Sequence, residues 1–413
     1  MMLREALVET VKSQMARIST AEYGVERERL GEINLKLPYA LIISGIRRCG
    51  KSTLLRQVMK NLRNFYYLNF EDTRLAGFEA SDFEKLDEVF KEELGVSEFY
   101  FFDEIQNIQG WELFVRSRLD KGKKFIITGS NASLLSKELG TRLTGRHLNI
   151  ELFPFSFREM LEFTGKKASL GAFDTYFTKG GFPEYIKYGE EDILRGLFAD
   201  VIQRDIVARH KIRDSKTLEE LALYLLTNVG KEFSYNGLKR MFSLGSVNTA
   251  ISFISYLEDS YLLFTVPKFD YSLKKQVVNP KKVYSIDNGL SAVNSVSFTR
   301  DKGRMLENLV FINLRKAYDE VFYFREKKEC DFLVKAKGEI KLAVQVCYHL
   351  TEDNRKRELE GLSEALNKFN LDKGLILTYN QEDTLSFDDK QVSVLPVWKW
   401  LLEKLPLYDA PKA

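Results

Sequence analysis

The stretch at residues 45–53 constrains this chain more than any other. It reads Gly45-Ile46-Arg47-Arg48-Cys49-Gly50-Lys51-Ser52, followed by Thr53. The two glycines permit a tight turn in which backbone N–H groups point inward at an anion. An apolar run at 39–44 predicts a buried strand before the loop, and helical spacing at 54–59 predicts a helix after it. This order is that of a phosphate-binding loop.

The side chains of the loop indicate a nucleoside triphosphate with Mg2+. Lys51 places a cation on the outer phosphates, and the Ser52 hydroxyl is a ligand that Mg2+ accepts. The helix that starts here directs its positive end at the same anion. We expect all of residues 45–53 to line the nucleotide. The alternative, a chance glycine-rich turn, is disfavoured because the complete pattern lies between a strand and a helix.

A second element follows at Phe99-Tyr100-Phe101-Phe102-Asp103-Glu104. Its four aromatic residues predict a stiff, buried strand that ends in two carboxylates. We expect Asp103 to hold Mg2+ and Glu104 to act as the general base that activates water. The alternative is a strand that simply ends in solvated acids, and the preceding phosphate loop weakens it.

A third strand at 125–128 runs into a polar segment. Asn131 or Ser130 in that segment would orient the lytic water between Asp103 and the outer phosphate, although Gly, Ser and Asn also favour an ordinary turn.

Two arginines further on are candidates for stabilising the charge of the transition state. We favour Arg146 over Arg142, acting in cis or from a neighbouring subunit. Most surface arginines have no such role, so a solvated arginine is the competing interpretation.

Composition bounds the remaining choices. At 413 residues the chain has room for two or three domains, and 44% hydrophobic with 13% aromatic content supports packed cores rather than disorder. The formal charge of +3 implies no nucleic-acid partner by itself. Scattered cysteines and histidines argue against a structural zinc site. Without an apolar membrane span or signal core, we expect an intracellular, cytoplasmic protein.

Alternating strands and helices predict the fold. Strands are expected at 39–44, 65–70, 99–103, 125–129 and 147–152, which gives an α/β fold with a parallel sheet and helices on both faces. Ligands bind such sheets at the carboxyl ends of the strands.

Further along the chain we expect four parts. They are a P-loop core with an N-terminal helical arm at 1–160, a helical lid or linker at 161–212, a winged helix-turn-helix at 213–295 and a small α/β domain at 296–413.

Basic residues outnumber acidic ones between 267 and 304. The basic residues are Lys268, Lys274, Lys275, Lys281, Lys282, Arg300, Lys302 and Arg304, against Asp270, Asp287 and Asp301. This excess and the winged helix suggest contact with a DNA backbone. The alternative is a solvated face on a helical module that contacts only protein.

These residues together resemble a family of prokaryotic AAA+-type ATPases. The resemblance rests on 45–52, Phe102-Asp103-Glu104-Ile105-Gln106, Thr128-Gly129-Ser130-Asn131, Gly145-Arg146, Pro154-Phe155-Ser156-Phe157, Gly181-Phe182-Pro183 and Glu307-Asn308. It implies ATP rather than GTP, with Asp103 as the Mg2+ residue, Glu104 as the catalytic base and Asn131 as the sensor.

The C-terminal part resembles the core of PD-(D/E)xK nucleases. Glu307 and Asp331 match two metal positions, but the third reads Gln345-Val346-Cys347 and lacks the lysine. Cys347 cannot stabilise charge on a scissile phosphate as lysine does. We therefore expect a nuclease-like fold without activity that docks nucleic acid or protein.

The expected function is Mg2+-dependent ATP binding and hydrolysis that drives a conformational change in a nucleic-acid-facing C-terminal half. One alternative is an ATP-controlled switch that grips a protein partner and hydrolyses slowly. A distant alternative is an ATP-coupled nuclease. An arginine supplied by a neighbouring subunit would require the chain to act as an oligomer.

Overall fold

The computed structural model describes residues 2–132, 145–297 and 301–403. The chain divides into two compact units. The first unit is Met1–Phe153 with Asp259–Tyr261, and the second is Pro154–Glu258 with Leu262–Ala413.

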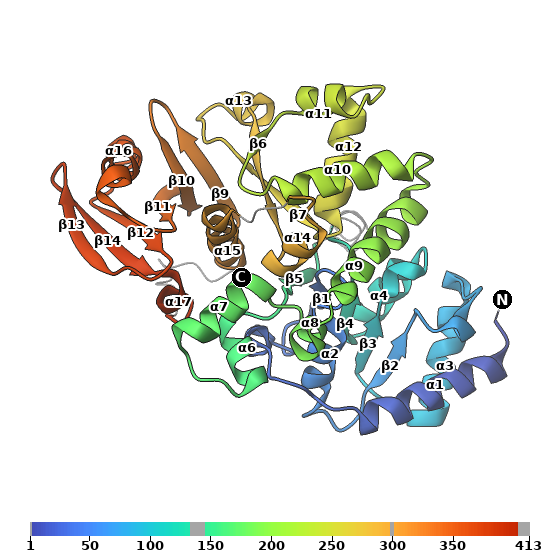
Figure 1. Cartoon of the computed structure of the whole chain (residues 1–413). Coiled ribbons are helices and arrows are strands. Elements are labelled where there is room, and N and C mark those ends of the chain that lie inside the picture. The colour runs from blue at the N-terminus through green and yellow to red at the C-terminus, as the bar shows by residue number, and fades with distance from the viewer. Residues whose placement is uncertain (1, 133–144, 298–300, 404–413) are drawn as a thin grey trace. The chain divides into compact units, whose positions relative to one another are not determined.

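The first unit is built on a five-stranded parallel sheet (Figure 1). Its strands are β1 (Ala40–Ser44), β2 (Tyr66–Asn69), β3 (Phe99–Asp103), β4 (Lys124–Gly129) and β5 (His147–Glu151), in the spatial order β2-β3-β4-β1-β5. This confirms the parallel sheet predicted from the alternation of strands and helices. Because β4 lies between β1 and β3, the segments that follow these three strands meet at one edge of the sheet.

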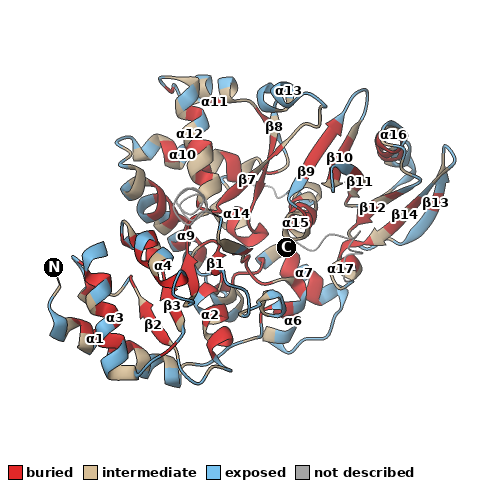
Figure 2. Ribbon diagram, turned by 180° about the vertical axis from the view of Figure 1, so that it is seen from behind, coloured by how far each residue is buried: buried red, intermediate tan, exposed pale blue. Residues whose placement is uncertain are grey.

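Helices cover the sheet of the first unit. They are α1 (Arg4–Thr20), α2 (Lys51–Met59), α3 (Phe83–Leu94) and α4 (Trp111–Leu119), with short turns η1 (Glu28–Glu32), η2 (Thr73–Leu75), η3 (Ala80–Asp82) and η4 (Ile105–Asn107). Helices α1, α3 and α4 share one aromatic core with the strands, which includes Phe102 and Phe125. The alternate residues Phe101 and Ile126 are also buried, so both faces of the sheet are covered, as Figure 2 shows by its buried strands.

The second unit begins with helices. They are α6 (Phe157–Thr164), α7 (Leu170–Lys179), α8 (Pro183–Tyr188) and α9 (Glu191–Asp200), which continues as the π-helix η5 (Val201–Ala208). Ser156 caps the start of α6, because its hydroxyl accepts from the Glu159 N–H while the Glu159 carboxylate accepts from the Ser156 N–H.

A three-stranded antiparallel sheet follows, in the order β6-β8-β7. Its segment contains α10 (Ser215–Thr227), β6 (Glu232–Phe233), α11 (Tyr235–Met241), α12 (Val247–Asp259), β7 (Leu263–Pro267), α13 (Leu273–Val278), β8 (Lys281–Ser285) and α14 (Asn288–Asn294).

The C-terminal part is a mixed six-stranded sheet in the order β13-β14-β12-β11-β10-β9. Its elements are α15 (Lys302–Ala317), β9 (Glu320–Arg325), β10 (Glu329–Ala336), β11 (Glu339–Cys347), α16 (Glu352–Lys368), β12 (Lys373–Thr378), β13 (Asp383–Phe387), β14 (Lys390–Pro396) and α17 (Val397–Trp400). Helix α16 packs on β10, β11 and β12. Across the described parts of both units, every helix is too short or too polar to cross a lipid bilayer.

Candidate active site

The loop between β1 and α2 needs glycine at two positions. A Cβ on Gly45 would lie 2.1 Å from the carbonyl oxygen of Leu152, so only a residue without a side chain fits there. Gly50 has φ 102°, in the left-handed region, and a Cβ there would lie 2.7 Å from Nη1 of Arg27. The turn predicted from the spacing of glycines is therefore required by both space and backbone conformation.

Lys51, the first residue of α2, is turned back into this loop. Its ammonium donates to the carbonyl oxygens of Gly45 at 3.0 Å and Ile46 at 3.2 Å. It also lies 3.5 Å from Oε1 of Glu104, and its side chain is only 4% exposed. A single buried positive charge therefore stands inside the curve of the loop, in contact with the acid that follows β3.

Glu104 is held in an unusual conformation at the end of β3. Its φ of 55° places a non-glycine residue in the left-handed region, a strained conformation that concentrates at functional sites. Nε2 of Gln106 donates to its Oε2 at 2.5 Å. Burial alone would raise the pKa of Glu104, but the charge of Lys51 and the bond from Gln106 lower it below its ordinary value. Its carboxylate is therefore ionised at neutral pH and able to accept a proton.

Asp103 is completely buried beside Glu104. The hydroxyl of Thr128 on β4 donates to its Oδ1, while Tyr67 and Asn69 on β2 lie within 3.4 Å of its Oδ2. These contacts fix the carboxylate from both neighbouring strands.

The surroundings of Asp103 suit a divalent cation. Burial and the negative charge of Glu104 raise the pKa of Asp103, although hydrogen bonds from Thr128 and Ser52 oppose the shift. A hydroxyl and a carboxylate thus meet at one point, and both are hard oxygen ligands of the kind that Mg2+ prefers. A bound cation would also offset the acid that burial leaves uncompensated. Ser52 and Asp103 therefore fit the metal positions predicted for them.

The segment after β4 is buried at the carboxyl edge of the sheet. Ser130 and Asn131 are each 1% exposed. Because β4 separates β1 from β3, they stand between the loop and Asp103. Nε2 of Gln106 reaches Oγ of Ser130 at 3.4 Å. That Asn131 or Ser130 orients water stays a prediction.

Comparison with known proteins supports this arrangement. Residues 38–161 match the model of the AAA domain. Residues 170–298 and 302–400 match two domains of unknown function, DUF8612 and DUF4143.

Two full-length relatives are similar over nearly the whole chain. An uncharacterised protein of Methanocaldococcus jannaschii is 36% identical over 397 residues, which cover 87% of this chain and 88% of that protein. An uncharacterised protein of Haemophilus influenzae is 30% identical over 386 residues, which cover 88% and 94%. The chain belongs to their family, and its N-terminal part is an AAA domain.

A solved structure is also similar, though distantly. DnaA from Aquifex aeolicus with bound AMPPCP shares 15% identity, over 60% of this chain and 88% of that one, with a TM-score of 0.29. A score this low leaves the site to be judged from the geometry of the AAA domain itself.

Arg146 is not where a residue acting on a phosphate in its own chain must be. Its carbonyl oxygen accepts from the N–H of Ala40, the first residue of β1, so it lies at the amino edge of the parallel sheet. The phosphate loop follows the opposite end of β1. The guanidinium pairs instead with Asp120 at 2.8 Å. The expectation of a role in cis was wrong for this reason, while a role toward a neighbouring subunit stays a prediction. Arg142 lies outside the described residues.

Arg27 is a residue in contact with the phosphate loop that the sequence did not reveal. Its buried guanidinium donates to the carbonyl oxygens of Cys49 at 2.6 Å and Phe153 at 2.7 Å. It therefore braces the phosphate loop from behind. Arg27 stands in a charged stretch of the N-terminal arm and matches no motif. Thr128, also missed, had a signal, since it is a polar residue at the end of an apolar strand.

In the second unit the structure also brings together the predicted pair Glu307 and Asp331, through the ammonium of Lys282. This corrects the expectation that Lys282 lies on a DNA-facing surface, because its side chain is 4% exposed. Lys281 is likewise engaged, donating to the carbonyl oxygens of Gln276 and Val277. The sequence therefore overestimated the basic surface between 267 and 304.

Proposed function

We propose that the AAA domain binds ATP with Mg2+ and hydrolyses it. The observation that carries this proposal is the meeting of four side chains at one edge of the sheet. Lys51 lies 3.5 Å from Glu104, and Asp103 is hydrogen-bonded by Ser52 and followed directly by Glu104. These groups provide a phosphate cation, two metal ligands and an ionised base.

Each group has a definite task in such a reaction. Lys51 holds the outer phosphates, and Ser52 with Asp103 holds Mg2+, which supplies charge neutralisation on the phosphates. Glu104 accepts the proton of the attacking water, and Asn131 or Ser130 orients that water. Since Lys51 pairs with Glu104 before ligand arrives, an incoming phosphate competes for the ammonium. Phosphate binding then frees the Glu104 carboxylate to face water.

The test is turnover by a Glu104→Gln variant. The amide keeps the size of the side chain and its contact with Gln106 but cannot take a proton, so we expect phosphate release to fall by about 10²- to 10⁴-fold while ATP still binds. Glu88→Gln, on the exposed surface of α3, is the matched control and should hydrolyse at the parental rate. Parental turnover by Glu104→Gln would assign the base to another residue.

ATP hydrolysis would act on the C-terminal half, and we propose the four-part division given above for the chain. The order α10, β6, α11, α12, β7, β8 supports a winged helix at 213–295. If its partner is DNA, the basic side chains left for phosphate contact include Lys239 and Arg240 on α11 and Lys274 and Lys275 beside the wing.

A protein partner is the second candidate, and a specific observation favours it. Helix α12, at the position of a recognition helix, contains no lysine or arginine and ends in Glu258-Asp259. The connection between β7 and β8 exposes Tyr271, Leu273, Val277 and Val278. Uncharged and apolar surface suits protein better than a phosphate backbone.

The two partners can be separated with the Glu104→Gln protein held in its ATP form. Binding to mixed-sequence duplex DNA that weakens steeply with salt would support a nucleic-acid partner. A partner protein that stays bound after nuclease treatment and in about 0.5 M salt would support the ATP-controlled protein-binding switch. At about 0.5 M salt, attraction between exposed charges is screened beyond a few ångströms, so binding that depends on ionic contacts should be lost.

A further inference from the structure

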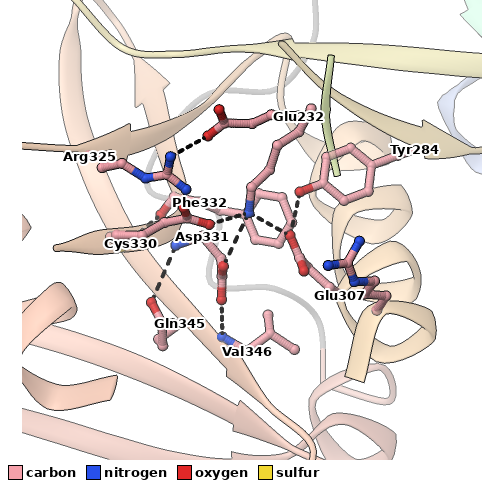
Figure 3. Close-up of polar contacts among 12 residues, drawn as sticks. Glu232, Tyr284, Glu307, Arg325, Cys330, Asp331, Phe332, Gln345 and Val346 are labelled. Carbon is pink, nitrogen blue, oxygen red and sulfur yellow. Dashed lines mark hydrogen bonds and ion pairs between the residues drawn. The ribbon is translucent and has the colours of Figure 1, made fainter. Parts of the chain in front are cut away.

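A buried lysine joins three acids in the second unit. Lys282 on β8 lies 2.9 Å from Oε1 of Glu307 on α15, 2.7 Å from Oε1 of Glu329 and 3.3 Å from Oδ1 of Asp331, both on β10. Figure 3 shows the carboxylates of Glu307 and Asp331 directed at the same point from helix and strand. The pairing of β10 with β9 shifts register between Cys330 and Leu333, which re-aims the side chain of Asp331.

The contacts of this cluster are saturated by the chain itself. An ammonium has three N–H donors, and the three carboxylates accept all of them. Other groups of the chain also donate to these carboxylates. Tyr284 donates to Oε1 of Glu307 at 2.6 Å, the N–H of Val346 donates to Oδ2 of Asp331 at 2.9 Å, and Arg325 pairs with Glu329. Lys282 therefore has no donor left for a phosphate oxygen.

The three carboxylates around Lys282 still outnumber its single ammonium. Burial raises the pKa of Asp331 to about 7, and the charge of Glu307 adds to the shift. Burial alone would lower the pKa of Lys282, but the surrounding acids raise it well above its ordinary value. The ammonium therefore stays charged, and the carboxylates favour a cation at this point strongly.

We propose that Glu307, Glu329 and Asp331 form a divalent-cation site that is filled by the chain's own lysine. Lys282 takes the place of the ion and closes the C-terminal sheet to metal-dependent chemistry. Hard carboxylate oxygens converging from a helix and a strand are the ligands of Mg2+ and Mn2+. Within the described ranges no group of three or more His, Cys, Asp and Glu side chains could hold a metal ion as the chain stands.

The direct test removes the lysine and offers Mn2+. Lys282→Met keeps most of the length of the side chain without its charge. In the absence of nucleotide we expect it to bind one more Mn2+ per chain than the parent, measured by loss of the free-ion signal in electron paramagnetic resonance. Adding Asp331→Asn to Lys282→Met should abolish the extra site. Lys274→Met, at an exposed position on α13, makes the same charge change and should bind no extra ion.

Three results would overturn the proposal. One is a folded Lys282→Met protein with no extra Mn2+, or with no more than Lys274→Met gains. Another is loss of bound Mn2+ when Asp331→Asn is made in the parent, which would mean that the ion already shares the site with Lys282. The last is metal-dependent DNA cleavage by the parent that Lys282→Met abolishes, which would make the lysine catalytic.

If Lys282→Met does not fold, a second measurement on the parent chain tests the proposal. The parent chain is treated under native conditions with an acetylating reagent, and modified lysines are identified by mass spectrometry. Lys282 should remain unmodified, because its ammonium is buried and fully bonded, while the exposed Lys274 should react. Glu307→Gln should make Lys282 more reactive by removing one of its three partners. Modification of Lys282 as fast as Lys274 in the parent would contradict the proposal.

Discussion

Two buried lysines, one in each unit, differ in what surrounds them. Both side chains are 4% exposed. Lys51 is bound by two backbone carbonyls and approaches one carboxylate at 3.5 Å. Lys282 has three carboxylates within 3.3 Å. The ammonium of Lys51 can therefore exchange its partners for a ligand, whereas the ammonium of Lys282 is bound by carboxylates of the protein.

The difference follows from the strength of the bonds involved. A hydrogen bond between two charged groups is roughly twice as strong as one to a neutral acceptor. The carbonyl oxygens that hold Lys51 are neutral, so a triphosphate can displace them. The acids around Lys282 would lose their shared counter-ion if the ammonium moved, and Asp331 among them is buried, which is strongly unfavourable. A buried lysine therefore indicates a ligand site only when its partners can be exchanged.

The largest expected effect comes from removing each ammonium in turn. Lys282→Met removes the ammonium that Glu307, Glu329 and the buried Asp331 share, so the free energy of unfolding should fall by about 3–5 kcal/mol. Lys51→Met removes bonds to neutral carbonyls and one contact with an acid, so the loss should be about 1–2 kcal/mol. Urea unfolding without nucleotide measures both. Equal losses of unfolding free energy in Lys282→Met and Lys51→Met would contradict the comparison. The control Lys274→Met should change stability by less than about 0.5 kcal/mol.

Asp287 extends the comparison to a buried acid held by backbone N–H groups. The N–H groups of Gly181 and Leu290 donate to its carboxylate at 2.7 and 3.0 Å. Burial nevertheless raises the pKa of Asp287 to about 6, from an ordinary value of 3.8. Because the folded pKa is the higher one, the stabilising contribution is present below pH 4 and is lost as pH rises through 6.

Asp287→Asn removes this titration. Relative to the variant, the parent should lose roughly 3 kcal/mol of unfolding free energy between pH 4 and pH 7, since each pKa unit corresponds to about 1.4 kcal/mol. Unfolding curves of both proteins across this range measure the difference. Stability curves that run parallel over the whole range would show that this carboxyl does not titrate as its burial requires.

The smallest effect concerns the bond that orders the acids near Lys51. The Thr128 hydroxyl donates to Asp103 and accepts from the Glu104 N–H at 3.0 Å. Thr128→Val keeps the shape of the side chain but removes both bonds, which should cost about 1–2 kcal/mol of stability. Thr384→Val at an exposed position on β13 is the control. No loss in Thr128→Val would mean that this hydroxyl does not fix the acids.

The nucleotide site was accessible from sequence because its parts are local patterns. Lys51 sits in a fixed motif, and Glu104 follows an aromatic strand, so each could be recognised within a few residues. Parallel strands then bring such ends to one edge, and only the strand order had to be left to the structure. Arg146 shows the limit, since a motif did not reveal at which edge of the sheet it lies.

The lysine cluster was not accessible in this way. Lys282 meets Glu307 and Asp331 across 25 and 49 residues of sequence, from three different elements. In the sequence Lys282 follows another lysine in a basic stretch, a pattern equally typical of a solvated surface. Arg27 was missed for the same reason. The hairpin of β13 and β14 was also missed, because its polar residues give little apolar signal.

The central claim is that Lys51 serves an incoming triphosphate, and calorimetric titration with Mg2+-ATP tests it most directly. The parent should bind, and Lys51→Ala should lose affinity by roughly 10- to 100-fold, because a charge-assisted bond of about 1.5–3 kcal/mol is removed. Lys121→Ala, an exposed lysine after α4, should bind as the parent does. The same affinity in Lys51→Ala and the parent would contradict the account.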